Sequence, residues 1–309
     1  MLFFMRQPFD PGITETYDGT LKRIINRDGS FNVRRHGRRL KDLHFYQFLI
    51  RISWPAFLAT IFAAFMAANL LFTGLYFAAG IDGLQGIPKG TPGEDFLHTL
   101  FFSVQTITTV GYGTVSPHSM AANTIVSLEA IMGVLGLAFS AALLYARFSR
   151  PDTRILFSNH AVVAPYQGIT GLQFRIANLR ANALLDLEAT VVLMTVEGTG
   201  SAAKRAYTTL ELERSSILFL PLTWTIVHPI DATSPLAAIT SESLKARAAE
   251  IMVLIRCFDD TFSQAVNIRY SYRSDEILWG YRFLPAFVND AKGHLVLDLT
   301  KMDDVIKTD

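Results

Sequence analysis

Positions 109–113 carry the run Thr-Val-Gly-Tyr-Gly, whose backbone is suited to binding a bare cation. Successive carbonyl oxygens that point to one axis can replace the water shell of a dehydrated ion. Such a backbone needs dihedral angles with positive φ, which Gly111 and Gly113 adopt without steric cost because they lack Cβ. The Thr109 hydroxyl adds an oxygen at the inner end, and the valine and tyrosine side chains point away from the ion. The expected ion ligands are the oxygens of Thr109, Val110, Gly111, Tyr112 and Gly113.

A short apolar segment, Asp95–Thr106, lies directly before this run. It makes about three helical turns and is too short to cross a bilayer, which requires roughly 20 residues. Non-helical backbone at membrane depth is tolerated only where protein buries it or where it lines a watery cavity. A re-entrant helix with its C-terminus directed inward would present its negative dipole end to a cation path. This context favours a pore over an ordinary Gly-Tyr-Gly turn.

Two longer apolar stretches flank the pore segment. Residues 52–80 contain no charged side chain, and residues 119–148 contain only Glu129 and Arg147. Each stretch is long enough to cross a bilayer with some tilt. Hydrophobic residues make up 50% of the chain and charged residues 18%, which is typical of a membrane protein that carries a soluble part. Two spans place both termini on one side of the membrane.

The placement of Lys and Arg predicts which side that is. Nine basic residues lie between positions 22 and 51 and three between positions 147 and 154, whereas the loop between the spans contains only Lys89. Both termini are therefore expected in the cytoplasm, with the chain in the cell inner (plasma) membrane. The basic clusters suit an anionic membrane surface. With a net charge of only +1, no nucleic-acid partner is expected.

Residues 37–51 carry polar and apolar stripes at helical spacing, which predicts an amphipathic helix at the membrane interface. The alternative is that this segment extends the first span into the cytoplasm. The sequence Ser53-Trp54-Pro55 favours a boundary, because proline disfavours helical conformation in the residue before it and suits the first turn of a new helix. Trp54 is then expected at the level of the lipid headgroups.

After Pro151 the long apolar runs give way to short β-rich segments separated by turn residues, which predicts a β-sandwich. The predicted strands are residues 161–164, 172–177, 187–196, 218–227, 251–258 and 265–272. Cys257 is the only cysteine and cannot form an intrachain disulfide, which fits a reducing cytoplasm. The seven histidines have no metal-ligand spacing, and no nucleophile motif or phosphate-binding loop occurs. We therefore expect no catalytic residue and no enzymatic activity.

Four segments resemble inward-rectifier potassium channels, in particular the prokaryotic branch of that family. They are FFSVQTITTVGYG at 101–113, ARFSRP at 146–151, RIANLR at 175–180 and IVHPIDATSPL at 226–236. The resemblance implies an α+β membrane protein, in which a two-helix potassium-channel pore with a re-entrant pore helix is joined to a cytoplasmic immunoglobulin-like β-sandwich. The expected domains are a cytoplasmic N-terminal segment (1–36), a transmembrane pore domain (37–150) and the cytoplasmic β-sandwich domain (151–309).

The resemblance also implies a homotetramer, with K⁺ bound at Thr109, Val110, Gly111 and Tyr112 and no cofactor other than this permeant ion. One run cannot form a ring around an ion, so four copies about a closed cyclic axis are expected on geometric grounds as well. The family carries a bulky side chain where its inner helices converge, and Tyr145 occupies that position. Four such rings would close the path by steric block and dewetting. The alternative is that Tyr145 faces lipid as an interfacial aromatic residue.

Anionic lipids are further expected partners. The residues Arg51, Trp54, Arg147 and Arg150 lie near one membrane face, where the family binds phosphoinositide headgroups. The alternative is that these arginines serve only to orient the chain. Strongly rectifying members of the family place an acid in the inner cavity that holds intracellular polyamines or Mg²⁺. This chain has Leu137 at that position, so block by these cations is expected to be weak unless acidic residues of the β domains substitute for the missing acid.

Two further residues depart from a simple pattern. Gln105 stands where many relatives carry a glutamate, and its amide is expected to hydrogen-bond the backbone of the run. Glu129 lies within the second span and must face the bundle interior or find a partner, so a pore-facing role and a structural role both stay open. Two other functions also remain as alternatives, a non-conducting membrane-anchored ligand-binding protein and a less selective cation channel.

Overall fold

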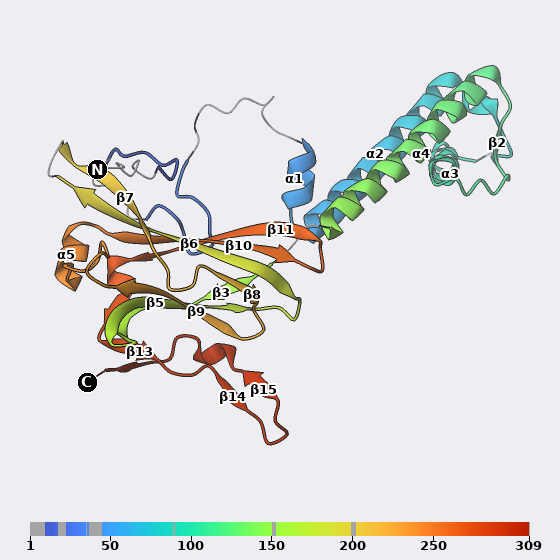
Figure 1. Ribbon diagram of the computed structural model, residues 1–309. Helices are drawn as coiled ribbons and strands as arrows, with labels where there is room; N and C mark the ends of the chain where they lie inside the picture. The colour runs from blue at the N-terminus through green and yellow to red at the C-terminus, as the bar shows by residue number, and fades with distance from the viewer. Residues whose placement is uncertain are drawn as a thin grey trace, which may run out of the picture. The chain divides into compact units, whose positions relative to one another are not determined.

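The computed structural model describes residues 10–17, 23–34, 36, 45–88, 90–149, 153–198 and 202–308, except for the side chain of Arg51. The chain divides into two compact units. One unit is Gly37–Arg150, and the other combines Met1–His36 with Pro151–Asp309. Figure 1 labels most of the elements of both units.

The unit Gly37–Arg150 is helical. Its helices are α1 (Phe45–Arg51), α2 (Trp54–Ala79), α3 (Pro92–Ile107) and α4 (Met120–Phe148). Helices α2 and α4 are long and apolar enough to cross a membrane, whereas α3, with 16 residues, is too short. The predicted pair of long helices with a short helix between them is therefore confirmed.

Helices α1 and α2 are separate. Helix α1 ends at Arg51, Ser53 has extended backbone, and α2 begins at Trp54 with a proline in its first turn. Pro55 has no N–H to donate to the carbonyl of Arg51, so it interrupts a helix that arrives from α1 and suits the first turn of a new one. The interpretation of one continuous helix is therefore wrong. Residues 37–44 of the predicted amphipathic helix lie outside the described residues.

The flanks of α3 are fixed by local features. Its N-terminus has a capping box, in which the N–H of Thr91 donates to Glu94 Oε2 at 2.7 Å and the Thr91 hydroxyl accepts from the N–H of Glu94. Strands β1 (Leu84–Gln85) and β2 (Ser116–Pro117) pair in antiparallel fashion and tie the segment before α3 to the segment after residues 109–113. The ends of the pore segment are therefore held together.

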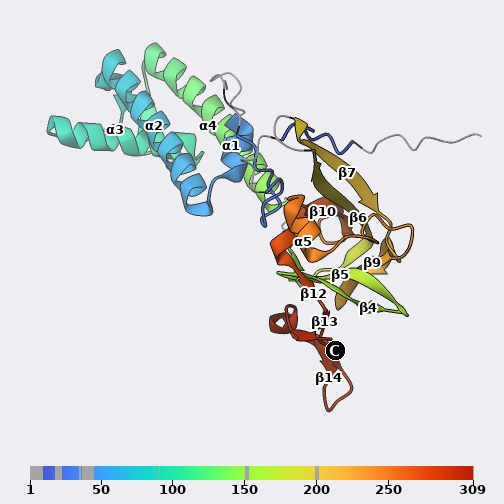
Figure 2. The ribbon, with the colours of Figure 1, turned by 90° about the vertical axis from the view of Figure 1, so that its left-hand side faces the viewer.

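The second unit is a β-sandwich of two five-stranded sheets (Figure 2). The first sheet has the order β11-β10-β6-β7, with β8 also paired to β6. Its strands are β6 (Leu184–Glu197), β7 (Lys204–Leu210), β8 (Ser216–Phe219), β10 (Glu250–Asp259) and β11 (Gln264–Arg273). The second has the order β12-β4-β5-β3, with β9 also paired to β5. Its strands are β3 (Ile155–Phe157), β4 (Ala161–Tyr166), β5 (Ile169–Asn178), β9 (Thr223–Ile230) and β12 (Ile277–Trp279). The facing sides of both sheets bury one apolar core.

Smaller elements complete this unit. Helix α5 (Ser241–Ala246) lies between β9 and β10 in the chain. Two small antiparallel sheets follow the sandwich, which are β13 (Tyr281–Phe283) with β16 (Val305–Lys307) and β14 (Phe287–Asn289) with β15 (Leu295–Leu297).

Most of the predicted strands are confirmed, since the segments 161–164, 172–177, 187–196, 251–258 and 265–272 fall within β4, β5, β6, β10 and β11. The single strand predicted at 218–227 is wrong. Strand β8 ends at Phe219, β9 begins at Thr223, and the two belong to different sheets. Pro221 lies between them and has no N–H for a ladder hydrogen bond, so the chain passes from one sheet to the other there.

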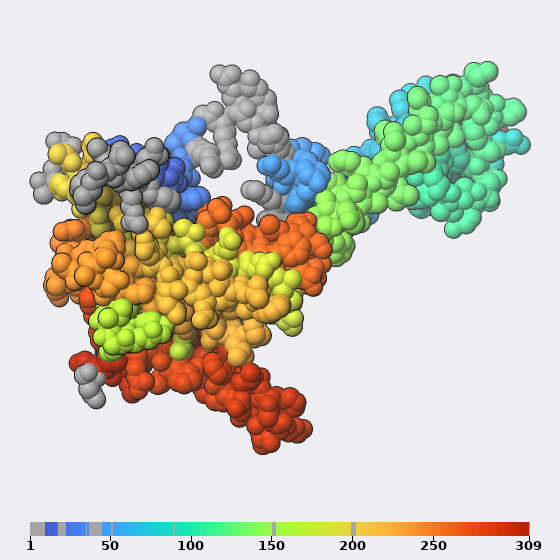
Figure 3. All heavy atoms as spheres, in the orientation of Figure 1, coloured from blue at the N-terminus to red at the C-terminus, as the bar shows by residue number. Residues whose placement is uncertain are grey.

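The N-terminal residues pack on the sandwich. Ile24 and Ile25 are buried against side chains of β6 and β10, and Thr16 forms an antiparallel bridge with Lys204 of β7. In Figures 1 and 3 the described N-terminal residues, in blue, lie against this sheet. The N-terminal segment and the sandwich therefore form one compact unit, although they are far apart in sequence.

Candidate ion-conducting site

The backbone of residues 109–113 alternates in handedness. Thr109, Gly111 and Gly113 have φ of 60°, 52° and 80°, whereas Val110 and Tyr112 are not among the residues with positive φ. Alternation of left- and right-handed conformations turns successive peptide planes the same way, so that their carbonyl oxygens gather on one side. The run therefore has the positive φ angles that were expected at its two glycines, and a further one at Thr109.

The backbone conformation of Thr109 was not predicted from the sequence. The glycines were expected to supply the positive φ angles, but Thr109 adopts one as well. A β-branched residue in this region is an outlier and costs about 1–3 kcal/mol, which persists where the surrounding structure fixes it. No sequence pattern signals this conformation, because threonine is a poor residue for it.

The N–H groups of the run face the C-terminal end of α3. Those of Val110 and Gly111 donate to the main-chain carbonyl of Gln105, at 2.9 and 3.2 Å, and that of Thr109 donates to the carbonyl of Thr106 at 3.0 Å. Among the described residues, none donates a hydrogen bond to a carbonyl oxygen of residues 109–113. These carbonyls are therefore available to a ligand. The main-chain carbonyl of Gln105 thus accepts hydrogen bonds from the run, whereas its side-chain amide was expected to bond the backbone there.

A buried polar cluster joins α2, α3 and α4. Glu129 of α4 is fully buried and accepts hydrogen bonds of 2.5 Å from Ser103 of α3 and from the hydroxyl of Tyr76 of α2. Ser103 also lies 3.0 Å from Oδ1 of Asn69, which belongs to α2. Glu129 therefore joins the three helices around the pore segment, and the structural interpretation of this carboxyl is favoured over the pore-facing one.

Helix α4 approaches the end of α3 at a glycine. A Cβ placed on Gly133 would lie 2.5 Å from the carbonyl oxygen of Ile107, so no larger residue fits without a shift of one helix. Gly136, one turn further along, has nothing within 4 Å of such a Cβ. Close packing at Gly133 sets the position of α3, and with it the position of residues 109–113.

The side chains of the run are not covered by this chain. Val110 is 52% exposed and Tyr112 is 73% exposed. They were expected to pack behind the run, and one copy of the chain does not provide that packing. Tyr145 and Leu137 on α4 are also exposed, at 75% and 68%. The residues predicted for the filter, the gate and the cavity thus all have surfaces that a single copy leaves open.

The structure brings together two of the four predicted lipid-binding residues. The Arg147 guanidinium lies over the rings of Trp54 and Phe57, 4.6 and 4.5 Å from their centroids. It donates to the carbonyl oxygens of Leu49 at 2.5 Å and Ile52 at 2.8 Å, and thereby caps the end of α1. Sequence reasoning missed these partners, since main-chain acceptors leave no pattern in a sequence. The side chain of Arg51 and the whole of Arg150 lie outside the described residues.

The β-sandwich presents no reactive group among its single cysteine and its buried histidine. Burial raises the pKa of Cys257 to about 11, so this thiol stays protonated at neutral pH. His228 is held between the carbonyl of Glu211 at 2.5 Å and the hydroxyl of Ser234 at 2.7 Å, and burial lowers its pKa. Within the described residues, no group of three or more His, Cys, Asp or Glu side chains is placed to hold a metal ion.

Comparison with known proteins agrees with this geometry. A family model described as ion channel matches residues 52–150, and one described as inward rectifier potassium channel C-terminal domain matches residues 155–309. The chain is 38% identical over 287 residues to the inward rectifier potassium channel Kirbac3.1 of Paramagnetospirillum magnetotacticum, covering 92% of this chain and 95% of that protein.

More distant relatives are human. The ATP-sensitive inward rectifier potassium channel 10 of Homo sapiens is 30% identical over 313 residues, covering 93% of this chain and 81% of that protein. The inward rectifier potassium channel 18 of Homo sapiens is 27% identical over 306 residues, covering 91% of this chain and 70% of that protein. These relatives are ion channels, and the similarity includes both the helical unit and the β-sandwich. With its two membrane helices, its short helix and its β-rich C-terminal domain, this chain belongs to the inward rectifier potassium channel family.

Proposed function

We propose that four copies of this chain form a K⁺-selective channel, in which residues 109–113 of each copy contribute one quarter of a ring of carbonyl oxygens. The alternating dihedral angles of this run carry the proposal, because they supply carbonyls on one side that have no donor among the described residues. K⁺ binds at Thr109, Val110, Gly111 and Tyr112 and is the only ion or cofactor that conduction requires.

The tetramer is supported by surfaces that one copy leaves open. Val110 and Tyr112 are apolar or aromatic and exposed, and an apolar groove of about 620 Å³ runs along α2 and α4. Cyclic symmetry would cover such surfaces with neighbouring copies and close the ring. Both termini lie in the cytoplasm, as the surplus of Lys and Arg before α2 and after α4 favours, and the spans lie in the cell inner membrane.

Tyr145 is the proposed gate. It lies one turn before the end of α4, it is largely exposed in one copy, and its ring is large enough to narrow a path shared by four copies. Leu137 lies about two turns earlier on the same helix and offers no carboxylate to a cation. Block by intracellular polyamines or Mg²⁺ is therefore weak in this channel.

Anionic lipids modulate the channel through Arg51, Trp54, Arg147 and Arg150. The contacts of Arg147 support this step, because its guanidinium links the end of α1 to α4. A lipid phosphate that competes for the guanidinium weakens this link, since charge-assisted hydrogen bonds to phosphate are stronger than those to a neutral carbonyl. A bound lipid would thus modulate the channel by changing the contact between α1 and α4.

The proposal is tested by Rb⁺ uptake into liposomes that contain the purified protein, with barium as blocker. We expect barium-sensitive uptake that greatly exceeds Na⁺ uptake. The variant Gly111→Ala should lose uptake because alanine disfavours φ of 52°, while Gly136→Ala, at a position of ordinary φ with free space, should keep it. Tyr145→Ala should increase uptake, and Leu135→Ala, at another exposed position of α4, should not.

The alternatives give different results in the same assay. A correctly assembled protein that conducts no ion at any lipid composition or pH would be a membrane-anchored ligand-binding protein. Equal uptake of Rb⁺ and Na⁺ would identify a less selective cation channel. Uptake that changes with anionic lipid in the wild type, but not in Arg147→Gln, would support the lipid site.

A further inference from the structure

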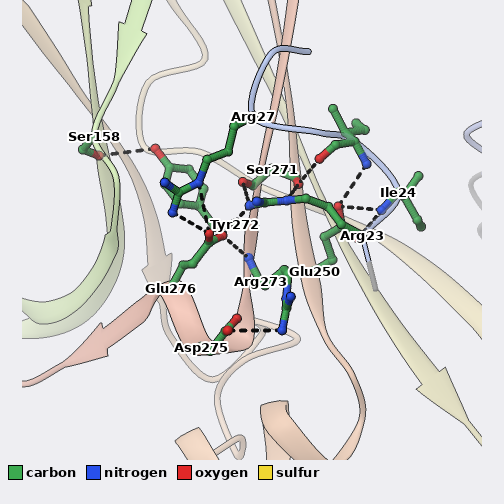
Figure 4. Close-up of polar contacts among 11 residues, drawn as sticks. Arg23, Ile24, Arg27, Ser158, Glu250, Ser271, Tyr272, Arg273, Asp275 and Glu276 are labelled. Carbon is green, nitrogen blue, oxygen red and sulfur yellow. Dashed lines mark hydrogen bonds and ion pairs between the residues drawn. The ribbon is translucent and has the colours of Figure 1, made fainter. Parts of the chain in front are cut away.

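The N-terminal segment forms one wall of a cavity on the sandwich. Its residues 14–17 run beside β7, where the N–H of Arg205 donates to the carbonyl of Glu15 at 2.8 Å. Further along, the N–H groups of Ile24 and Ile25 donate to the carboxylate of Glu250, at 2.9 to 3.2 Å. Figure 4 shows Ile24 beside Glu250, with Arg273 on the neighbouring strand. The segment is thus anchored on both sides of the cavity.

The cavity has a volume of about 260 Å³ and lies among β7, α5, the start of β10 and the end of β11. Its polar lining residues are Tyr17, Arg205, Lys245, Glu250, Arg273 and Ser274. Three basic side chains against one carboxylate leave an excess of two positive charges. The carboxylate of Glu250 also accepts hydrogen bonds from two N–H groups of the N-terminal segment, and the lining keeps a net positive charge. The guanidinium of Arg273 forms an exposed ion pair of 3.1 Å with Asp275.

Among the lining residues, Arg205 is buried and keeps one donor without a partner in the described part of the chain. It is 6% exposed, and one terminal nitrogen donates to the carbonyls of Thr14 and Thr16, at 3.3 and 2.5 Å. Its guanidinium lies 5.4 Å from the ring centroid of Tyr17. Its Nε is buried and has no hydrogen-bond partner in the described part of the chain. A buried donor without an acceptor normally marks a place that an ion or water occupies.

We propose that this cavity binds a small phosphate-bearing anion. Guanidinium groups bind phosphate oxygens through paired donors, and the cavity offers two of them together with the Lys245 ammonium. The hydroxyls of Tyr17 and Ser274 add neutral donors. Pockets for drug-sized ligands have volumes of roughly 300–1,000 Å³, so a cavity of about 260 Å³ suits inorganic phosphate, pyrophosphate or the phosphate end of a larger molecule.

Such an anion would hold the N-terminal segment on the sandwich. It would contact Arg205, which already binds the main chain of residues 14–16, and Lys245 on α5, which does not. Occupancy of the cavity therefore links the segment to α5 through the anion. The cavity is lined by residues of the N-terminal segment and the β-sandwich, and none of them belongs to residues 109–113. A failure of the proposed channel function would therefore not contradict anion binding here.

The experiment is calorimetric titration of the full-length protein in neutral detergent with pyrophosphate at constant ionic strength, with chloride as the competing anion. We expect saturable binding with one site per chain. Lys245→Gln and Arg273→Gln should each weaken it by about tenfold, because each removes a charge-assisted hydrogen bond. Lys204→Gln and Arg247→Gln, which remove neighbouring charges outside the cavity, should leave the affinity unchanged.

A second arm identifies the source of the phosphate. The same titration is run in nanodiscs of phosphatidylcholine alone and with phosphatidate added. A loss of pyrophosphate affinity with phosphatidate, absent in Lys245→Gln, assigns the cavity to a lipid headgroup, whereas an unchanged affinity assigns it to a soluble anion. No saturable binding, or an equal loss of affinity in the cavity variants and in both control variants, would overturn the proposal.

Discussion

Ser103 and Glu129 join the short helix α3 to the long helix α4 through a fully buried hydrogen bond of 2.5 Å. The second carboxyl oxygen of Glu129 accepts from Tyr76 of α2, so one acid satisfies polar groups of three helices. Polar groups in an apolar setting are costly unless they are paired, which makes this cluster a strong restraint on helix position. The restraint acts on α3, whose C-terminal carbonyls accept hydrogen bonds from the N–H groups of residues 109–111.

Ser103→Ala should therefore destabilise the protein by about 1–3 kcal/mol, because it leaves one buried oxygen of Glu129 without a donor. The measurement is thermal unfolding of the purified channel in detergent. Ser127→Ala is the matched control, since Ser127 is exposed and its hydroxyl bonds, within the described residues, to the carbonyl of Asn123 in its own helix. Equal melting temperatures for the two variants would show that the cluster does not restrain α3.

Gly133→Ala should impair the pore more than Gly136→Ala. The added methyl group at Gly133 would lie 2.5 Å from the Ile107 carbonyl oxygen, which belongs to the backbone and cannot rotate away. Overpacking of this kind costs typically 1–3 kcal/mol. We expect reduced Rb⁺ uptake and a lower melting temperature for Gly133→Ala, and near-normal values for Gly136→Ala. Wild-type uptake by both variants would contradict the close approach of α4 to α3.

The sequence predicted the elements of the pore well, because each has a strong physical pattern. Two long apolar stretches became α2 and α4, and the short apolar segment became α3. The proline after Trp54 marked the break before α2. The left-handed conformation of Thr109 was not predictable, since it opposes the preference of a β-branched residue and is imposed by hydrogen bonds to α3.

The contacts between residues that are far apart in the chain could not be predicted from the sequence either. Arg147 was identified as a lipid contact, but the carbonyls of Leu49 and Ile52 that bind its guanidinium have no residue-specific pattern. Strand β7 was missed because Lys204, Arg205 and the threonines that follow make it polar, and pairing with β6 decides its conformation. The docking of Ile24 on the sandwich depends on Glu250, which is 226 residues away.

Glu276 should hold the N-terminal segment in a pH-dependent manner. It pairs with Arg23, and with Arg27 at 2.7 Å (Figure 4). Burial raises the pKa of this carboxyl, but the hydrogen bond from the N–H of Arg273 and the two arginines outweigh burial and lower it below its usual value of 4.5. A lowered pKa means that the carboxylate stabilises the docked segment above pH 4.5 and that this contribution is lost as the pH falls through the folded-state pKa.

Glu276→Gln should therefore increase hydrogen exchange of the Ile24 and Ile25 amides at pH 7, by an amount that corresponds to about 2 kcal/mol of local stability. After correction for intrinsic rates, the difference from wild type should shrink as the pH falls below 4.5. Asp275→Asn is the control, because Asp275 is exposed and its ion-pair partner in the described part of the chain is Arg273. A difference between wild type and Glu276→Gln that is the same at all pH values would show that the ion pairs do not hold the segment.

Substitutions of Thr109 should separate the effect of backbone strain on stability from the effect of the hydroxyl on ion binding. Thr109→Gly relieves a φ of 60° that costs a β-branched residue about 1–3 kcal/mol, so the melting temperature should stay equal or rise. The same change removes the hydroxyl oxygen at the inner end of the run, so the preference for Rb⁺ over Na⁺ should fall. Thr109→Ser keeps the hydroxyl and should keep the preference, which isolates the oxygen as the cause. If Thr109→Gly and Thr109→Ser discriminate equally well between the two ions in liposome uptake, the carbonyl oxygens alone bind the ion and the hydroxyl is not a ligand.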